Sequence, residues 1–413
     1  MNNPNEKELL ALIKERATNQ EKTQAKISNS QERGDQLNAP CFRVVGGGSK
    51  DFYGAPLKGE PLSTKGLQGI VSYEPSELYI TAQAGTPLIE VESVLKEKGQ
   101  YLAFDAPNFT GSATIGGVVA AGLSGPARAS SGSVRDYVLG LTMINGRGEH
   151  LSFGGQVIKN VAGYDVSRVL CGSWGTLGVI TQVSLKVLPQ STAEQTILLH
   201  GIDQQRAIEW LNQWGATALP LNASVWRGVS GDKFVPSKTN TTKGELLIRL
   251  RGAAAAVAAG FQNVQNQCTA HGVTLQTLEE QAAEQTWVDY KNQSQEFFKN
   301  PICAEDCLWR LSVPQKTPVL NIEGVDPSKP QCMEWNAGLR WIWAPSASSQ
   351  TIQSKAKSVG GHATLWRVSQ SLSALDKDVG VFTEISSAQR RIQNSLQREF
   401  DPWGLFDTGR LEI

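Results

Sequence analysis

The chain has 413 residues, 40% of them hydrophobic, and this length favours two domains that each bury a core. Its 39 Lys and Arg residues balance its 39 Asp and Glu residues, so no global field favours nucleic acid or an anionic membrane. No window predicts a membrane span, and the polar residues 1–20 lack the basic start and apolar run of a signal peptide. Six scattered cysteines do not suggest a disulfide framework, so the sequence predicts a cytoplasmic protein.

The sequence contains no recognisable set of metal ligands. Cys303 and Cys307 are the one close cysteine pair, and the cysteine runs that bind iron–sulfur clusters are absent. The histidines do not pair at short spacing: His150, His200, His271 and His362. Because a zinc site needs a full ligand set, we predict no metal site and no cluster that would let this chain pass electrons onward.

The first half of the chain begins with a helix and then becomes rich in glycine. The apolar residues of 6–17 fall on one helical face, and the polar residues 18–38 are typical of a linker. A further helix is predicted at 91–98, ending at Gly99, and Asn145-Gly146 indicates a hairpin. Strands are predicted at 42–45, 77–82, 137–144, 150–153 and 179–188.

After Pro189 helical and strand patterns alternate, and every tryptophan except Trp174 lies in this half. Helices are predicted at 203–214, 253–269 and 387–399. Strands are predicted at 223–227, 245–251, 308–313, 338–343 and 364–368. This alternation favours an α+β domain with helices on one face of a sheet.

The first segment that indicates chemistry runs from Arg43 to Gly54, where a strand enters the loop Gly46-Gly47-Gly48-Ser49. Successive glycines let backbone N–H groups converge on a phosphate, and a serine hydroxyl adds a donor. Taken alone, the loop is more simply a tight turn. It is not a Rossmann fingerprint, because no G-x-G-x-x-G opens a helix here.

Two further segments repeat the combination of glycine and hydroxyl groups. Residues 111–122 contain Thr114-Ile115-Gly116-Gly117, and residues 129–136 contain Ser133, Arg135 and Asp136. Such loops suit the two sides of a pyrophosphate. Arg135 has two open interpretations, a phosphate contact and a salt bridge within the domain.

The fourth segment consists of residues 159–165, beginning at Lys159, and residues 172–181. Its glycines permit close backbone approach to a flat ligand. The strand that begins at Gly178-Val179-Ile180 offers main-chain groups to the edge of a flavin or an adenine. Alone, this segment is again a turn into a strand.

Together the four segments resemble the FAD-binding domain of the vanillyl-alcohol oxidase / p-cresol methylhydroxylase (PCMH) superfamily. In that superfamily the strand–GGG and T-I-G-G loops flank the FAD pyrophosphate, and the G-T-L-G-V-I-T segment lies along the cofactor. The resemblance covers residues 41–189. It implies an α+β fold, in which a PCMH-type FAD-binding domain of two α/β subdomains, divided near residue 110, precedes an α+β cap domain with an antiparallel sheet.

The corresponding domain boundaries are 1–38 for the N-terminal helix and linker, 39–190 for the FAD-binding domain, 191–385 for the cap, and 386–413 for a C-terminal helix and tail that return to the FAD-binding domain. We expect FAD to be bound by Gly46, Gly47, Gly48, Ser49, Gly54, Thr114, Ile115, Gly116, Gly117, Ser133, Arg135, Asp136, Lys159, Gly178, Val179 and Ile180.

Within the superfamily, GLSGPARASSGSVRDYVLG and the stretch from IKNVAGYD to LKVLP look like the glycolate-oxidase branch. Residues 308–314, 335–341, 360–364 and 400–410 resemble its FAD-binding E-subunit type. The paired histidines and the Glu-His-Gly segment of the D-subunit type are absent. The family's closing Asn-Pro-Gly-Arg stands here as Asp407-Thr-Gly-Arg410.

This resemblance implies oxidation of glycolate to glyoxylate, with a catalytic D-type flavoprotein and an iron–sulfur F-type subunit as partners. Contact with the inner membrane is then peripheral and made through those partners. The alternatives are a stand-alone FAD dehydrogenase of another small 2-hydroxy acid, such as D-lactate, and a structural subunit without catalysis.

Covalent members of the superfamily attach the flavin through a His in the first glycine loop or through a Cys elsewhere. The first loop here has neither, and Cys171 is most simply a buried apolar residue, so we predict non-covalent FAD. If the chain itself oxidises a 2-hydroxy acid, Arg340 is the candidate for binding the carboxylate and His362 for accepting the proton. The alternatives are that Arg340 faces solvent across a strand and that His362 is a turn residue.

Overall fold

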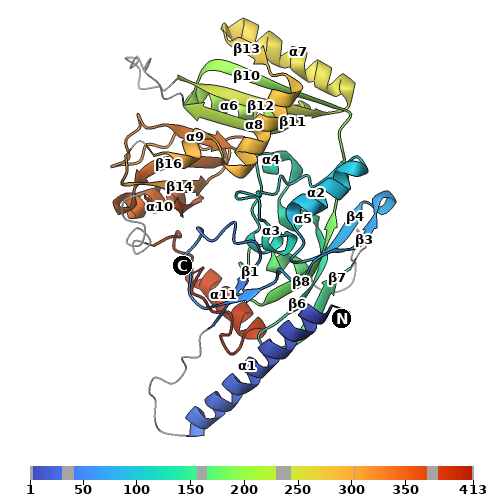
Figure 1. The fold of residues 1–413 in the computed structure, drawn as a ribbon. Coiled ribbons are helices and arrows are strands. Elements are labelled where there is room, and N and C mark those ends of the chain that lie inside the picture. The colour runs from blue at the N-terminus through green and yellow to red at the C-terminus, as the bar shows by residue number, and fades with distance from the viewer. Residues whose placement is uncertain are drawn as a thin grey trace.

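The computed structural model describes residues 3–29, 41–155, 165–228, 243–301, 303–369 and 380–411. Its first element is helix α1 (Pro4–Asn29), which Figure 1 shows crossing the foot of the N-terminal half. Leu9, Ile13 and Ala17 are buried against this half, as the apolar pattern predicts. The helix continues through residues assigned to a linker, because no Gly or Pro interrupts this stretch and its Gln, Glu, Lys and Ala residues favour helix.

The described residues of the N-terminal half form three separate sheets. Strands β1 (Phe42–Val45) and β2 (Glu60–Ser63) form a parallel pair. An antiparallel five-stranded sheet has the order β3-β4-β8-β6-β7. Its strands are β3 (Ile70–Glu74), β4 (Tyr79–Gln83), β6 (Val138–Ile144), β7 (His150–Gly154) and β8 (Val179–Lys186).

The division near residue 110 is wrong for this sheet. Strands β3 and β4 precede residue 110, yet β4 pairs with β8 along its whole length. The predicted hairpin at Asn145-Gly146 is confirmed, since β6 and β7 pair on either side of it. A short ladder of β5 (Gln100–Tyr101) and β9 (Leu188–Pro189) completes this half.

Short helices cover the five-stranded sheet and bury its core. They are α2 (Leu88–Glu97), α3 (Ile115–Ala121), α4 (Arg128–Ser131) and α5 (Val134–Tyr137), with 3-10 turns at Pro75–Glu77 and Ser167–Leu170. Leu88, Val91 and Leu95 of α2 are fully buried against the sheet. Burial of such side chains stabilises the fold by about 2 kcal/mol each.

The C-terminal half, called the cap below, is built on one antiparallel sheet of eight strands in the order β13-β10-β12-β11-β15-β16-β14-β17. This confirms the predicted antiparallel sheet. The strands are β10 (Ala193–Asp203), β11 (Leu221–Gly228), β12 (Lys243–Gly252), β13 (Thr274–Thr277), β14 (Asp306–Ser312), β15 (Gln331–Glu334), β16 (Leu339–Pro345) and β17 (His362–Arg367).

Helices lie on both faces of the cap sheet, not on one. Helices α6 (Gln204–Gly215), α7 (Ala254–His271) and α10 (Ser349–Ser358), the last following a 3-10 turn at Ser346–Ser348, pack on the outer face. Helices α8 (Glu280–Asn292) and α9 (Glu296–Lys299) pack on the inner face, which is turned toward the N-terminal half. The hydrophobic pattern of α8 in the sequence is weak, because few of its side chains are buried: Ala283, Trp287 and Tyr290.

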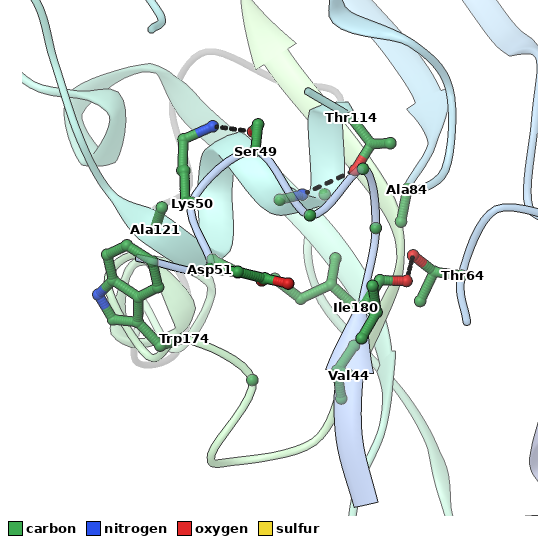
Figure 2. A pocket seen from close by; sticks show the side chains of 18 of the residues that line it. Val44, Ser49, Lys50, Asp51, Thr64, Ala84, Thr114, Ala121, Trp174 and Ile180 are labelled. Atoms are coloured by element: carbon green, nitrogen blue, oxygen red, sulfur yellow. Dashed lines mark hydrogen bonds between the residues drawn. The ribbon is translucent and has the colours of Figure 1, made fainter. Parts of the chain in front are cut away.

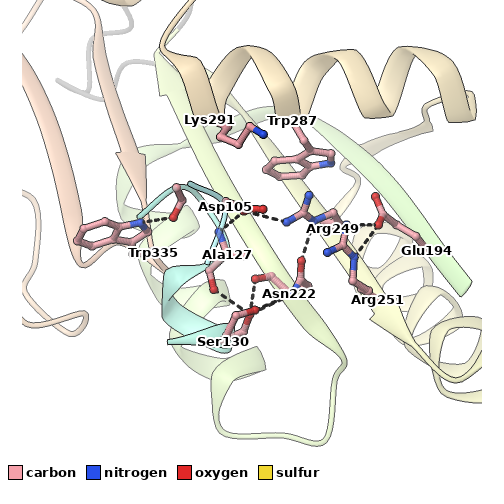
Figure 3. Close-up of polar contacts among 12 residues, drawn as sticks. Asp105, Ala127, Ser130, Glu194, Asn222, Arg249, Arg251, Trp287, Lys291 and Trp335 are labelled. Carbon is pink, nitrogen blue, oxygen red and sulfur yellow. Dashed lines mark hydrogen bonds and ion pairs between the residues drawn. The ribbon is translucent and has the colours of Figure 1, made fainter. Parts of the chain in front are cut away.

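A polar cluster joins the two halves (Figure 3). The Asp105 carboxylate accepts a bond from the Ala127 N–H and pairs with Arg249 Nη2 at 3.1 Å, while Arg249 Nε donates to Asn222. Nearby, Trp335 Nε1 donates to the Gly125 carbonyl at 2.9 Å. These contacts hold the inner face of the cap sheet against residues 105–130.

The C-terminal segment returns to the N-terminal half, where the end of α11 (Ser387–Phe400) lies at the turn between β6 and β7, since the Gly146 N–H donates to the Phe400 carbonyl at 2.8 Å. The Phe400 ring lies 6.2 Å from that of Phe153. After the helix, the Phe42 N–H donates to the Leu405 carbonyl at 2.6 Å. The chain end therefore packs beside the strand that leads into the glycine loop.

Candidate functional site

A cleft of about 660 Å³ lies where three predicted glycine segments meet (Figure 2). Its walls are the loop after β1, the start of α3, and residues 174–180. The residues predicted to bind FAD that line it are Gly46, Gly47, Gly48, Ser49, Thr114, Gly116, Gly117, Gly178 and Ile180. The fold thus brings together parts of the first, second and fourth segments.

The loop after β1 requires glycine because it packs directly on the second glycine segment. A Cβ at Gly47 would lie 1.5 Å from the Ser112 carbonyl oxygen, and one at Gly46 would lie 2.3 Å from Thr114 Oγ1. Gly48 adopts φ +71°, a conformation that favours glycine. Backbone without side chains therefore forms this wall of the cleft.

The second wall is the first turn of α3. Thr114 caps the helix, since its Oγ1 accepts a bond from the Gly117 N–H at 3.3 Å. Gly116 must be small because a Cβ there would lie 2.6 Å from the Ala84 side chain. Gly117 differs, because its Cβ would meet only Thr114 Oγ1, at 3.2 Å, and would otherwise enter the cleft.

The third wall contains Trp174, which adopts an unusual φ of +54°. Its ring stacks on Tyr53 with centroids 4.3 Å apart, and the Arg410 guanidinium lies 4.7 Å from the ring centroid. Arg410 also donates to the carbonyls of Lys50 and Tyr53. The arginine of the closing Asp-Thr-Gly-Arg segment therefore fixes the glycine loop and the Trp174 wall together.

Lys50 is a cleft residue that the sequence reasoning missed. Its side chain is buried, its Nζ donates to Ser49 Oγ at 3.2 Å, and no carboxylate pairs with it among the described residues. Burial lowers the pKa of Lys50 to about 8. The one signal in the sequence was its position directly after the Gly-Gly-Gly-Ser loop.

Other predicted residues lie outside the cleft lining. Ile115 and Val179 are buried in the core, and Gly54 packs against the Arg410 backbone. Lys159 lies outside the described residues.

The third predicted segment forms a helix cap in place of a cleft wall. The Ser133 hydroxyl and N–H both donate to the Asp136 carboxylate, at 2.8 and 2.7 Å, and the backbone bond is the main cause that lowers the pKa of Asp136. Arg135 is exposed beside them on α5. The structure therefore gives Ser133 and Asp136 a local structural role.

Arg340 and His362, the two predicted catalytic residues, lie on opposite faces of the cap sheet. Arg340 points to the outer face, where its guanidinium donates to the carbonyls of Ala337, Thr317 and Pro318. This occupied side chain is not brought near the cleft. His362 lies opposite Ser312 on the inner face, where desolvation and the charges of Arg310 and Arg128 lower its pKa.

The cleft fits a dinucleotide that carries a pyrophosphate. A wall of backbone groups that cannot accept a Cβ permits close approach of phosphate oxygens, and Lys50 is a buried cation without a counter-ion. No His or Cys lines the cleft among the described residues. In the same part of the chain, no three His, Cys, Asp or Glu side chains gather as metal ligands, and no helix is long and apolar enough to cross a membrane.

Comparison with known proteins agrees with this geometry. A family model described as an FAD binding domain matches residues 24–154. The solved structure of p-cresol methylhydroxylase with substrate bound superposes with a TM-score of 0.60 at 12% identity, covering 90% of this chain and 84% of that one. The chain therefore has the fold of p-cresol methylhydroxylase and contains a segment that matches an FAD binding domain.

Two relatives of known name indicate the family within this fold. The glycolate oxidase subunit GlcE of Escherichia coli K12 is 37% identical over 368 residues, which are 89% of this chain and 91% of the relative. The glycolate oxidase subunit GlcD of Bacillus subtilis 168 is 32% identical over 134 residues, only 32% of this chain and 28% of the relative. The chain belongs to the family of the glycolate oxidase subunit GlcE.

Proposed function

We propose that the chain is the FAD-binding subunit of a glycolate oxidase complex that converts glycolate to glyoxylate. The observation that carries this proposal is the similarity to GlcE, which spans nearly the whole of both chains. The partners in this proposal are a catalytic D-type flavoprotein and an iron–sulfur F-type subunit, which receive the electrons and account for any peripheral contact with the inner membrane.

We further propose that FAD is bound without a covalent bond. The described lining of the cleft offers no histidine or cysteine for attachment. Cys171 precedes the third wall but does not line the cleft, and burial raises the pKa of its thiol to about 12. A neutral, buried thiol is a poor nucleophile, which supports dissociable FAD.

In this proposal the residues of the cleft bind and orient the cofactor. The backbone of Gly46, Gly47 and Gly48 approaches the pyrophosphate, and Lys50 supplies the positive charge that balances it. Trp174 and Ile180 form apolar walls that exclude water. When bound, FAD supplies the hydride-accepting chemistry of a 2-hydroxy-acid oxidation.

The second candidate is a stand-alone FAD dehydrogenase of another small 2-hydroxy acid, such as D-lactate. One observation favours it, namely that the inner face of the cap carries a partly buried arginine, Arg310, in a pocket beside the cleft. A chain that only carried electrons would not need such a cation in its cap.

The experiment is a visible spectrum of the purified chain before and after acid precipitation, followed by anaerobic addition of glycolate or D-lactate. We expect a flavin spectrum that moves to the supernatant as FAD, and co-purification of D-type and F-type subunits with the tagged chain. Flavin retained in the precipitate would contradict non-covalent binding. A monomer that bleaches with D-lactate and not with glycolate would replace the first candidate by the second.

A further inference from the structure

A second, smaller pocket lies between the inner face of the cap sheet and residues 107–125. Its walls include Phe109, Arg310, Glu334, Trp335 and Trp366. The pocket shares a wall with the FAD cleft, because the Phe109 ring that lines it lies 5.5 Å from Lys50 Nζ, which lines the cleft. A ligand of a few heavy atoms fits this space.

Arg310 is the distinctive group of this pocket. Its guanidinium lies 5.0 Å from the Trp335 ring centroid and 5.7 Å from that of Trp366. Within the described ranges it makes no hydrogen bond or ion pair, whereas Arg249 pairs with a carboxylate and Arg340 with carbonyls. Arg310 is partly buried and its donors are not buried away from solvent, so they are open to an anion that enters the pocket.

The other polar groups of the pocket wall already have partners. Trp341 Nε1 donates to the Glu334 carboxylate at 2.8 Å, and Trp366 Nε1 donates to Gln293 Oε1 at 2.8 Å. Glu334 lines the same pocket as Arg310, yet the two form no ion pair in the described structure. The donors of Arg310, which lines the pocket, are therefore not used by these groups.

An aromatic layer links the pocket to the cleft. Trp174, which lines the cleft, stacks on Tyr53, and Tyr53 contacts Trp366 edge-on with centroids 5.3 Å apart. Arg128, over the Trp335 ring at 4.4 Å, adds a second positive charge beside the pocket. The region next to the cleft is thus aromatic, small and positively charged.

We propose that this pocket binds the carboxylate of the small 2-hydroxy acid and that Arg310 is its receptor. The proposal rests on the proposed function. A planar guanidinium matches a carboxylate with two parallel hydrogen bonds, and the flanking tryptophan rings hold its plane in place. The position of Arg310 on the inner face gives it the role that the sequence pattern had suggested for Arg340.

The test is a titration of the full-length chain with oxalate, a dicarboxylate that has no C–H hydride to lose. Tryptophan fluorescence reports binding, because Trp335, Trp341 and Trp366 surround Arg310. We expect saturable binding by the wild type and a loss of at least about tenfold in affinity for R310M, since charged hydrogen bonds contribute that much. R310K should be intermediate, because it keeps the charge and loses the two-point contact.

The control is R206M, which removes an arginine of α6 on the outer face of the cap and should bind oxalate as the wild type does. Equal oxalate affinity for folded R310M and wild type, or no binding of oxalate, glycolate or D-lactate at all, would overturn the proposal. A different result would refute the proposed function and leave the proposal for this pocket standing. Oxalate binding that depends on Arg310, in a chain without FAD or one that acts on D-lactate alone, would keep this pocket and refute glycolate oxidation.

Discussion

Replacing Lys50 by Met separates the stability of the apoprotein from its affinity for FAD. Methionine keeps an unbranched side chain over Phe109 but removes the buried charge. If Lys50 balances a pyrophosphate, the variant should be more stable than the wild type without cofactor and should bind FAD more weakly. Most substitutions in a binding cleft lower both quantities, so this opposite response is diagnostic.

The magnitude follows from the effect of burial, which lowers the pKa of Lys50 from 10.5 to about 8. At 1.36 kcal/mol per pH unit, holding this charge in the folded apoprotein costs about 3 kcal/mol at pH 7. Loss of the bond to Ser49 Oγ offsets about 1 kcal/mol of the gain in K50M. The expected net stabilisation of the apoprotein is therefore about 2 kcal/mol.

The stability difference between K50M and the wild-type apoprotein should depend on pH. Between pH 8 and 10.5 the unfolded wild-type chain binds the Lys50 proton and the folded chain does not, so wild-type stability rises with pH in this window. The advantage of K50M should be complete below pH 8 and should disappear by about pH 10.5. Denaturant unfolding of both apoproteins at pH 7 and pH 10 measures it, with K58M at an exposed lysine as the control.

FAD affinity is the second readout, measured by quenching of flavin fluorescence during titration. A charged hydrogen bond to phosphate contributes about 2 kcal/mol, so K50M should bind FAD at least about tenfold more weakly. Unchanged FAD affinity would refute the role of Lys50 as the counter-ion. A less stable K50M apoprotein at pH 7 would refute the argument from burial.

Three further changes test other parts of the structure. Gly117→Ala should leave the stability of the apoprotein equal or up to about 1 kcal/mol higher, but should weaken FAD binding because the added methyl group enters the cleft. Equal FAD affinity of the variant and the wild type would place the cofactor away from α3. Burial raises the pKa of Glu334 to about 7, so the Glu334→Gln variant should be more stable than the wild type by about 3 kcal/mol above pH 7 and equally stable near pH 4.5. Identical denaturant unfolding curves of the two proteins at pH 8 would contradict this. Asp105→Asn should lower the free energy of unfolding in denaturant by about 2 kcal/mol, because Arg249 loses its carboxylate partner. Glu92→Gln, which removes the carboxylate of the half-exposed pair with Lys291, should lower it by under about 1 kcal/mol. Equal losses would show that the polar cluster in Figure 3 does not hold the cap.

The sequence was most informative where local pattern and tertiary packing agree. Strand β1 has the predicted bounds, and α7 and α11 are each within two residues of prediction. The linker prediction for 18–38 was wrong over its first part, because polarity does not prevent a helix from forming when no Gly or Pro interrupts it. The placement of β3 and β4 depends on pairing with β8, about a hundred residues away, and no local signal encodes that register.

For the candidate site, the glycine content of the sequence predicted the walls of the cleft but did not indicate the positive charge of Lys50. The first loop packs on Ser112 and Thr114 because Gly46 and Gly47 carry no Cβ, and clustered glycines indicate such close approach. Lys50 was missed because a lysine in a loop is normally solvated, and only the packing of Phe109 and the surrounding loops buries it. Hydroxyls are harder to assign from sequence, since Ser133 serves a helix cap in this structure, a local use that hydroxyls share with phosphate binding.

Strand parity decides which of the two arginines of the cap sheet, Arg340 or Arg310, faces the N-terminal half. Side chains alternate between the faces of a strand, so an assignment to a face fails completely if the reference residue is misjudged. On β14, Leu308 packs on the inner face and Trp309 on the outer face, which places Arg310 inside. On β16, Trp341 is inside, which places Arg340 outside. Because tryptophans occupy both faces of this sheet, hydrophobicity alone could not set the parity, and only the docking of the cap on the N-terminal half identifies Arg310 as the arginine that lines the second pocket.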